Sequence, residues 1–196
     1  MSKITILSSL ITLSLVFTAC SSDKKASTED ANSIIDAPIK TAVAPNKFEL
    51  TSITDKKYTI KKDKDGFYLK DNKNKIILLD IFATWCPPCR AEASHLTSLQ
   101  KKYPNDLVVI GITIEDGIPN EKLENFKHQS DAEYILVNSK TNATLVDAVI
   151  SSLKMDKNFG IPLMVMYKDG QLIRYYQGIT EEEFIESDIK IALDKK

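Results

Sequence analysis

The chain has 196 residues, of which 43% are hydrophobic, and its 26 basic and 27 acidic side chains give a net charge of −1 at pH 7. A near-neutral chain without a basic stripe interleaved with aromatic residues is not typical of a nucleic-acid-binding protein. The length, with no internal repeat, predicts one domain with a substantial hydrophobic core.

The first 19 residues have the pattern of a secretory signal peptide. One basic residue, Lys3, precedes an apolar stretch from Ile4 to Phe17, and small residues follow before Cys20. The stretch is shorter than the roughly 20 apolar residues of a membrane span. Its end resembles a bacterial lipobox, in which the cysteine becomes the lipidated N-terminus after cleavage. An uncleaved anchor and a freely secreted form stay open as alternatives.

The segment after Cys20 is rich in Ser, Thr, Asp, Lys, Ala and Pro and has little periodicity, which predicts a flexible, solvated tether. Lipidation would consume the thiol of Cys20 and leave an even pair of cysteines, as suits an exported protein. The chain is therefore expected to have three parts, namely a signal peptide (1–19), a lipidated cysteine with its tether (20–46) and a folded domain (47–196).

The folded part begins with two segments of loose alternation, Phe48–Ile60 and Gly66–Leu69, which predict a hairpin. The run Ile76–Ala83 is almost continuously apolar, as expected for a central strand covered on both faces. One carboxylate, Asp80, interrupts that run. Burying a carboxylate is costly unless it has a partner or a task, and burial should raise its pKa.

A pair of cysteines follows this strand directly, in the run Trp85-Cys86-Pro87-Pro88-Cys89. Apolar residues then recur at helical spacing as far as Pro104, at Ala93, Leu96, Leu99 and Tyr103. The first cysteine is thus expected at a helix N-terminus, where unpaired N–H groups and the helix dipole favour the thiolate. The pattern indicates thiol–disulfide exchange.

Two other interpretations of the cysteine pair are weaker. Three cysteines cannot supply four thiolates, and a zinc site would need both His95 and His128 at unusual spacings. We interpret both histidines as ordinary helix residues. A purely structural disulfide closing so short a loop would add only about 2 kcal/mol of stability on the loop-closure model. The redox group is then the disulfide itself, and no metal or other cofactor is expected.

The rest of the chain alternates strand and helix patterns. Leu107–Ile114 predicts a second buried strand, and Leu163–Tyr167 predicts another, joined to a last strand by a turn at Asp169-Gly170. Between these strands the apolar spacing predicts a short helix, a short strand and a second helix, at Leu123 and Phe126, at Tyr134–Val137, and at Leu145, Val149 and Leu153.

A final helix is predicted from the capping-box pattern of Thr180 and Glu183, with apolar residues facing inward at Ile185, Ile189 and Leu193. Strands alternating with helices, followed by a hairpin and a last helix, predict a three-layer α/β/α sandwich.

Two motifs in this order resemble a known family. The run from Phe82 to Glu92 contains the cysteine pair, and about seventy residues later Gly160-Ile161-Pro162 precedes a strand and the turn Lys168-Asp169-Gly170. They resemble the thioredoxin superfamily, in particular its TlpA/ResA-like extracytoplasmic branch, from Phe48 onward. The resemblance implies a thioredoxin-like three-layer α/β/α sandwich with a lead-in β-hairpin and a helix–strand insertion at about residues 115–140. It also implies that Pro162 is cis and lies against the cysteine pair.

The two cysteines are expected to have different roles. Cys86, as the more exposed sulfur at the helix start, is the expected nucleophile, and Cys89, one turn inside, is the expected resolving thiol. Pro87 and Pro88 have no backbone N–H to stabilise the thiolate of Cys86. We therefore expect a reducing pair, with a potential nearer the thioredoxin value of about −270 mV than the oxidant value of about −120 mV.

The resemblance implies supporting roles for five further residues. In thioredoxins the residue matching Asp80 assists deprotonation of the buried cysteine, here Cys89, and a strand-end salt bridge is the alternative. Glu115 matches an acidic position near the cysteine pair in ResA-like proteins, with a solvated turn residue as the alternative. Ile161 and Pro162 are expected to offer backbone groups and a flat apolar face to an extended substrate, with a simple loop proline as the alternative. Trp85 is expected on the same rim.

The leading hypothesis is a membrane-tethered thiol–disulfide oxidoreductase on the extracytoplasmic (periplasmic) side of a bacterial membrane. It would reduce protein disulfides, for example in cytochrome c maturation or metal-site assembly. Its expected partners are protein thiols and disulfides, a membrane thiol-reductase as electron donor, and the membrane through the lipid anchor; we expect a monomer and no nucleic acid. The alternatives are a disulfide oxidase or isomerase of the same fold, and a metal-binding or chaperone lipoprotein. A peroxidase is disfavoured, since that chemistry prefers different surroundings for a lone peroxidatic cysteine.

Overall fold

The apolar run at residues 76–82 forms the middle strand of the largest sheet, and each of its residues is buried. The structure is a computed structural model that describes residues 45–64 and 66–194. The elements follow in the order β1 (Lys47–Thr51), β2 (Lys57–Lys62), β3 (Phe67–Leu69), the 3-10 helix η1 (Lys70–Asn72), β4 (Ile76–Phe82), α1 (Pro87–Lys102), β5 (Leu107–Thr113), α2 (Asn120–Ser130), β6 (Ile135–Val137), α3 (Asn142–Ser152), β7 (Leu163–Lys168), β8 (Gln171–Gln177) and α4 (Glu182–Asp194). The predicted order of strands and helices is confirmed.

The large sheet has five strands in the order β6-β5-β4-β7-β8. Strand β4 pairs with β5 in parallel and with β7 in antiparallel orientation. The turn between β7 and β8 has positive φ at both Asp169 (54°) and Gly170 (81°). This backbone matches the right-handed twist of the flanking strands, which is why Asp-Gly predicted the hairpin correctly.

The predicted lead-in hairpin is present and is larger than expected. Strands β1 and β2 pair in antiparallel fashion, and β3 adds a third strand to form a separate small sheet. Its inner face is apolar and buried, with Phe48, Leu50, Ile60, Phe67 and Leu69 pointing into the core.

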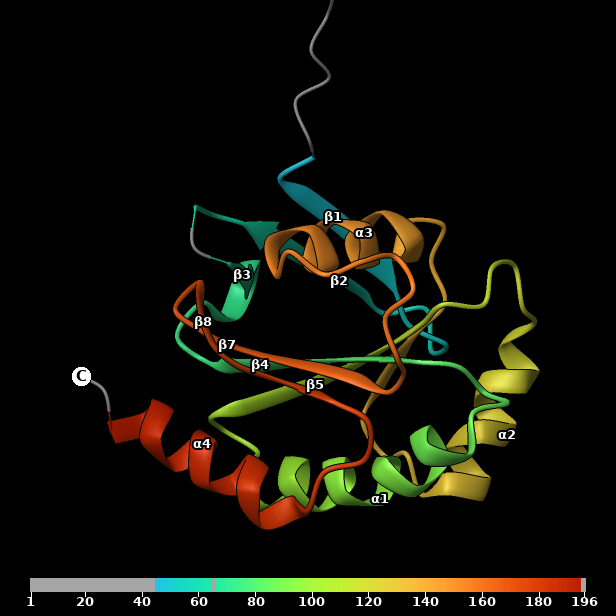
Figure 1. Ribbon diagram of the computed structural model, residues 1–196. Helices are drawn as coiled ribbons and strands as arrows, with labels where there is room; N and C mark the ends of the chain where they lie inside the picture. Colours follow the sequence, from blue (N-terminus) through green and yellow to red (C-terminus); the bar gives the residue numbers. More distant parts are fainter. Residues whose placement is uncertain (1–44, 65, 195–196) are drawn as a thin grey trace, which may run out of the picture. The chain divides into compact units, whose positions relative to one another are not determined.

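The five-stranded sheet is the middle one of three layers, as predicted (Figure 1). The small sheet and α3 cover one face, and α1, α2 and α4 cover the other. Alternate residues of β4 enter the two resulting cores. Ile76, Leu78 and Phe82 lie on the side of α1, whereas Ile77 and Leu79 lie on the side of α3. Because Asp80 is in phase with Leu78 and Phe82, it faces α1.

The last helix begins later than its capping-box pattern predicts. Helix α4 starts at Glu182, and Thr180 lies two residues before it. The backbone N–H of Thr180 donates to Glu92 of α1 at 2.7 Å, and its hydroxyl donates to the carbonyl of Gly178. A tertiary partner therefore holds Thr180 away from the cap position. The inward placement of Ile185 and Ile189 is confirmed.

The predicted signal peptide, Cys20 and most of the tether lie outside the described residues, and β1 begins at Lys47. No helix between residues 45 and 194, residue 65 aside, is both long and apolar enough to cross a membrane.

Candidate active site

The cysteine pair lies at the start of α1, shortly after the end of β4, as the sequence predicts. Cys86 is the N-cap of α1, with an extended backbone (φ −83°, ψ 112°), and Pro87 and Pro88 are the first helical residues. Proline is well suited there, because the first N–H groups of a helix have no partner inside it. Cys86 and Cys89 are joined by a disulfide, with their Cα atoms 5.3 Å apart.

Two backbone groups approach the sulfur of Cys86. The N–H of Cys89 donates to it at 3.2 Å. The carbonyl oxygen of Ile161 lies 3.8 Å from it. A disulfide sulfur carries no proton, so this second contact becomes a hydrogen bond only when Cys86 is a thiol. The Ile161–Pro162 peptide bond is cis, and this loop lies against the cysteine pair, as the resemblance implies.

The exposure of the two sulfurs differs from the expectation. Cys86 is 3% exposed and Cys89 is 2% exposed, so in the disulfide form the first sulfur is not distinguished by access to solvent. The reason is packing, since Ile161 lies against the cluster that contains both cysteines. Their positions still differ, because Cys86 caps the helix beside Trp85, which is 64% exposed, and Cys89 lies one turn inside.

Two charged side chains form hydrogen bonds with Thr84, in the segment that joins β4 to α1. Glu115, just after β5, accepts from the Thr84 N–H at 2.5 Å and from its hydroxyl at 3.1 Å. Arg90 of α1 donates from Nε to the Thr84 carbonyl at 2.9 Å. Glu115 therefore binds the segment that leads into Cys86 and is not a solvated turn residue.

Asp80 is 2% exposed, and its carboxylate has one hydrogen-bond partner in the described chain. The hydroxyl of Tyr134 donates to its Oδ2 at 2.9 Å, and Oδ1 has no partner. The pKa of Asp80 is raised to about 7, chiefly by burial; the Tyr134 hydrogen bond opposes this rise, and the charge of Glu92 adds a smaller upward contribution. No basic side chain is paired with Asp80 among the described residues, so a strand-end salt bridge does not explain it.

A glycine makes room for this pair. Gly111 of β5 is the register partner of Asp80. A Cβ atom at Gly111 would lie 2.7 Å from Leu136 and 3.0 Å from the ring of Tyr134. The lack of a side chain at this position lets the Tyr134 ring approach the sheet beside Asp80.

A second buried carboxylate lies one turn after Cys89. Glu92 is 1% exposed; its Oε2 accepts from the N–H of Thr180, and its Oε1 has no hydrogen-bond partner. Burial raises the pKa of Glu92, while the Thr180 N–H and the nearby His95 lower it. The Nδ1 atom of His95 lies 3.8 Å from Oε1 and 3.2 Å from the Thr180 carbonyl. Two buried acids, Asp80 and Glu92, thus face the core that contains Cys89.

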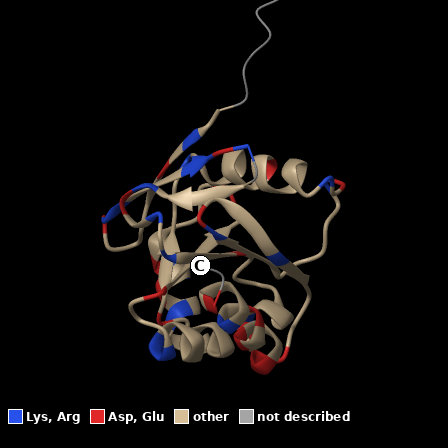
Figure 2. Cartoon of the chain, turned by 90° about the vertical axis from the view of Figure 1, so that its left-hand side faces the viewer, with Lys and Arg blue, Asp and Glu red and all other residues tan. Residues whose placement is uncertain are grey.

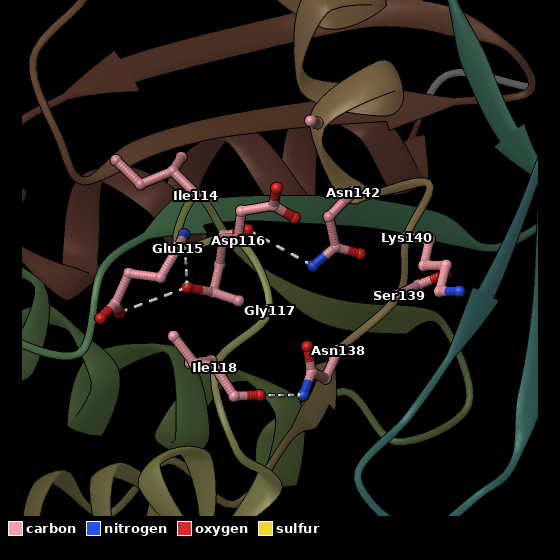
Figure 3. Close-up of a pocket in the computed structure, with 11 residues that line it drawn as sticks. Ile114, Glu115, Asp116, Gly117, Ile118, Asn138, Ser139, Lys140 and Asn142 are labelled. Atoms are coloured by element: carbon pink, nitrogen blue, oxygen red, sulfur yellow. Dashed lines mark hydrogen bonds between the residues drawn. The ribbon is translucent and has the colours of Figure 1, made fainter.

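Two surface hollows border Glu115, and neither is lined by a cysteine. Trp85, Arg90 and Glu115 line one hollow of about 250 Å³ together with residues of α2. Glu115 also borders a larger hollow of about 590 Å³ at the ends of β5 and β6. Figure 3 shows this larger hollow, with Asn138 donating to the carbonyl of Ile118. The side chain of Asn142 donates to the carbonyl of Thr113, the last residue of β5. It contains neither cysteine, so we do not assign the redox chemistry to it.

Among the described residues, no group of three or more His, Cys, Asp and Glu side chains is placed to hold a metal ion. His128 lies in α2. His95 lies in α1, and its contacts are with Thr180 and Glu92 rather than with the disulfide.

Several residues of the site were not singled out from the sequence. Tyr134, Arg90 and Thr84 act through partners on other elements, and no local pattern marks them. Glu92 could have been found, because it follows Cys89 by three residues and so lies on the same face of the helix. The apolar spacing of α1 draws attention to its leucines, not to an acid among them.

Comparison with known proteins gives a family match. The model of the AhpC/TSA family matches residues 42–186. The thioredoxin-like protein YneN of Bacillus subtilis is 41% identical over 54 residues, which are 28% of this chain and 32% of YneN. The thiol-disulfide oxidoreductase ResA of Bacillus cereus is 29% identical over 126 residues, which are 62% of this chain and 66% of ResA. The matches thus span about a third of YneN and just under two thirds of ResA.

Solved structures share the fold. A thiol:disulfide interchange protein of the thioredoxin family from Chlorobium tepidum superposes with a TM-score of 0.57 at 18% identity, covering 76% of this chain and 95% of that one. A secreted disulfide oxidoreductase of Mycobacterium tuberculosis gives a TM-score of 0.54 at 14% identity, covering 74% and 95%. At such identities the likeness establishes a thioredoxin-like α/β fold alone.

Proposed function

Because this chain belongs to the AhpC/TSA family and has a thioredoxin-like fold, we propose that it is a thiol–disulfide oxidoreductase that acts through Cys86 and Cys89. The observation that carries the proposal is the disulfide between these residues at the N-terminus of α1, with the Ile161 carbonyl 3.8 Å from the Cys86 sulfur. The disulfide is the redox group, and the proposed reaction needs no metal or other cofactor.

The proposed cycle starts from the dithiol. The Cys86 thiolate attacks one sulfur of a substrate disulfide, a Cys86–substrate disulfide forms, and the other substrate sulfur leaves as a thiolate. Cys89 then loses its proton and attacks the Cys86 sulfur. The substrate leaves with two thiols, and the Cys86–Cys89 disulfide carries the two oxidising equivalents. A thiol-bearing reductase in the membrane would reduce it again.

The proton of Cys89 needs an acceptor in a buried site. Asp80 is suited to this step, because its Oδ1 has no partner in the described chain and burial raises its pKa to about 7. A base whose pKa lies near the working pH can accept a proton and lose it again in each cycle. Tyr134 holds the other oxygen, so only Oδ1 is left for the thiol.

Substrate binding is proposed at the rim around Cys86. Trp85 offers an exposed ring, and the loop with Ile161 and cis Pro162 offers a backbone edge and an apolar face. An extended peptide could pair with that edge while its sulfur reaches Cys86. This mode suits protein substrates, among them disulfides of an apocytochrome c or of a metal-site assembly protein.

The direction of the reaction is proposed to be reducing. Pro87 and Pro88 leave the Cys89 N–H as the backbone donor to the Cys86 sulfur. With fewer donors the thiolate of Cys86 is less stable, so the disulfide is favoured over the dithiol. The reduction potential of the pair is therefore lower. Together with export, lipidation at Cys20 and a tether at 20–46, this describes a monomeric reductant on the outer side of a bacterial membrane.

Insulin reduction tests the chemistry. The chain should accelerate precipitation of insulin by dithiothreitol, and Cys86→Ser should abolish the acceleration. Cys89→Ser should instead accumulate a stable Cys86–substrate disulfide, which identifies the substrate directly. Retention of full activity in Cys86→Ser would disprove the proposal. Equilibration with glutathione buffers decides the direction, since a potential near about −120 mV would mark an oxidase or isomerase.

A further inference from the structure

The outer face of the small sheet carries lysines in adjacent strands. The register places Lys47 of β1 opposite Lys61 of β2, and Lys61 opposite Tyr68 of β3. Side chains alternate between the two faces of a strand, and the neighbours Phe48 and Ile60 are buried in the core. Lys47, Lys61 and Tyr68 therefore point away from the core, and two like charges face each other there.

Three more lysines adjoin this face. Lys57, on β2, and Lys70, in η1, lower the pKa of Glu49, which is chiefly lowered by its hydrogen bond with Lys47. The Nζ of Lys73 lies 4.9 Å from the centre of the Tyr68 ring. Three lysines, Lys47, Lys57 and Lys70, thus act on the Glu49 carboxylate, while Lys61 and Lys73 lie beside Tyr68. We call this surface the lysine face, made of Lys47, Lys57, Lys61, Lys70 and Lys73 around Glu49 and Tyr68.

A shallow hollow opens on this face. It has a volume of about 280 Å³, and it is lined by Asn46, Lys47, Lys61, Lys62, Asp63 and Tyr68. Three of these six side chains are cationic and one is anionic. The hollow is therefore suited to receive a phosphate group that replaces water around the lysines.

The charge is unevenly divided along the chain. Residues 45–75 contain nine lysines and five acidic residues, whereas residues 76–196 contain 13 basic and 18 acidic residues. A chain of net charge −1 thus carries a surplus of four positive charges in the segment that forms the small sheet. Figure 2 shows lysines along the strands and turns at the upper end of the domain, where β1 begins.

Like charges directly opposite each other on a sheet are destabilising. An anionic partner spread over a surface would remove this cost. Such a partner matches lysines that are distributed over β1, β2 and the η1 segment after β3. Strand β1, on which the lysine face begins, follows residues 20–46, which form the tether in the proposed function. A flexible tether of about 26 residues would have a root-mean-square reach of about 30 Å and would hold the small sheet near the membrane.

We propose that the lysine face docks the domain onto the surface of a membrane rich in anionic lipids. This inference rests on the membrane attachment in the proposed function, not on its redox chemistry. The small sheet covers the face of the central sheet opposite α1 (Figure 1). Docking therefore leaves the N-terminus of α1, with Trp85 and Cys86, accessible to a membrane-bound reductase and to substrates.

Vesicle sedimentation of the mature chain, beginning at residue 20 and carrying Cys20→Ser, tests the docking without a lipid anchor. Both apolar cores lie within residues 48–193, so this form retains them. We expect binding to vesicles of phosphatidylglycerol mixed with phosphatidylcholine, weakened by added salt. Each lysine near an anionic surface contributes about fivefold to binding, so the triple variant Lys57→Gln, Lys61→Gln, Lys70→Gln should bind about a hundredfold more weakly.

A matched control removes the same charge elsewhere. The triple variant Lys101→Gln, Lys127→Gln, Lys190→Gln alters α1, α2 and α4 and should lose only a fewfold in binding. Equal losses in the two triple variants would overturn the proposal, as would equal binding to phosphatidylcholine alone. Binding to soluble polyglutamate but not to vesicles would also overturn it and would indicate an acidic protein partner. Circular dichroism checks that both variants are folded.

The same preparations separate this inference from the proposed function. A chain that binds anionic vesicles but does not reduce insulin would disprove the redox proposal and support the docking. A chain that reduces insulin but ignores anionic vesicles would disprove the docking alone.

Discussion

The hydroxyl of Tyr134 donates a 2.9 Å hydrogen bond to Oδ2 of Asp80, and both side chains are buried. Burial raises the pKa of Tyr134 well above its usual value, so the phenol stays protonated and acts as the donor. The contact joins the centre of β4 to the segment before β6. The Oδ1 atom of Asp80 has no hydrogen-bond partner among the described residues.

The first prediction concerns this hydrogen bond. Tyr134→Phe removes a donor that favours the charged form of Asp80, so the pKa of Asp80 should rise above about 7. Loss of one hydrogen bond to a charged group corresponds to a shift of about one pH unit. If Asp80 takes the proton of Cys89, the pH midpoint of mixed-disulfide resolution should move upward by that amount. Release of the second thionitrobenzoate from Ellman's reagent measures this step.

Tyr103→Phe is the matched control for that experiment, because the Tyr103 hydroxyl bonds to Glu186 on α4 and not to Asp80. Its resolution profile should coincide with that of the unmodified chain. An unchanged profile in Tyr134→Phe as well would exclude Asp80 as the proton acceptor.

The second prediction concerns stability and pH. The pKa of Asp80 is raised to about 7 in the folded chain from 3.8 when unfolded, so between these values the folded state holds the extra proton. The contribution of Asp80 to the free energy of unfolding is fully present below about pH 4. It is lost as the pH rises through 7, and the loss is on the order of 4 kcal/mol. Asp80→Asn should therefore be more stable than the unmodified chain at pH 8 and about equal to it at pH 4.

Urea unfolding of both proteins at the two pH values measures the difference. If the stability of the unmodified chain relative to Asp80→Asn rises with pH, the carboxylate is stabilised in the folded state and the argument from burial is wrong.

The third prediction concerns the corner before Cys86. Glu115→Ala leaves the N–H of Thr84 without its carboxylate acceptor. An unsatisfied buried donor costs about 1–3 kcal/mol. We expect the free energy of unfolding, measured in urea, to fall by that amount. We also expect slower attack of Cys86 on Ellman's reagent, because Glu115 no longer holds the segment before Cys86. The neighbour Asp116 is exposed, so Asp116→Ala should change stability by less than about 0.5 kcal/mol.

Equal destabilisation by the two alanine variants would show that Glu115 acts only as a surface charge. Glu115→Gln is a further check, because an amide oxygen can still accept from Thr84 and should restore most of the stability.

The fourth prediction concerns the prolines. Pro88 is the second residue of α1, and Cys86 is its N-cap. An N-cap side chain accepts from the second or third helical N–H, so Pro88→Ala adds a donor for the Cys86 thiolate. The pKa of Cys86 should fall and the potential should rise by about 30 mV, which corresponds to about 1.4 kcal/mol. Glutathione titration measures the change, with Pro104→Ala, beyond the end of the helix, as the control.

An unchanged reduction potential in Pro88→Ala would mean that the missing N–H does not determine the reduction potential of the Cys86–Cys89 disulfide. The proposal of a reducing direction would then lose its structural support.

Much of the fold was predictable because its signals are local. Continuous apolar residues predicted β4, Asp-Gly predicted the β7–β8 hairpin, and helical spacing predicted α1 up to Pro104. The cysteine pair and Pro162 were found because each is marked by short sequence motifs. The start of α4 was predicted wrongly, because Thr180 donates to Glu92 on a distant helix instead of capping its own.

The relative exposure of the cysteines was not predictable in the same way. A position at a helix start suggests an open sulfur, but Ile161, 75 residues further along the chain, packs against Cys86. Likewise, Glu115 could be recognised as acidic and near the end of a strand. Its bonds to Thr84 depend on how β4 and β5 pair.

The sequence alone determined the chemistry available to this protein, because residue types, short motifs and the period of apolar residues are properties of neighbours along the chain. It determined a cysteine pair at a helix start, an acid within a buried strand and a lysine-rich beginning of the domain. Tertiary structure decided which groups meet. Tyr134 reaches Asp80 only because Gly111 leaves space between them, and Lys47 faces Lys61 only in the observed register. Such contacts depend on the packing of segments far apart in sequence, and packing is a property of the whole fold.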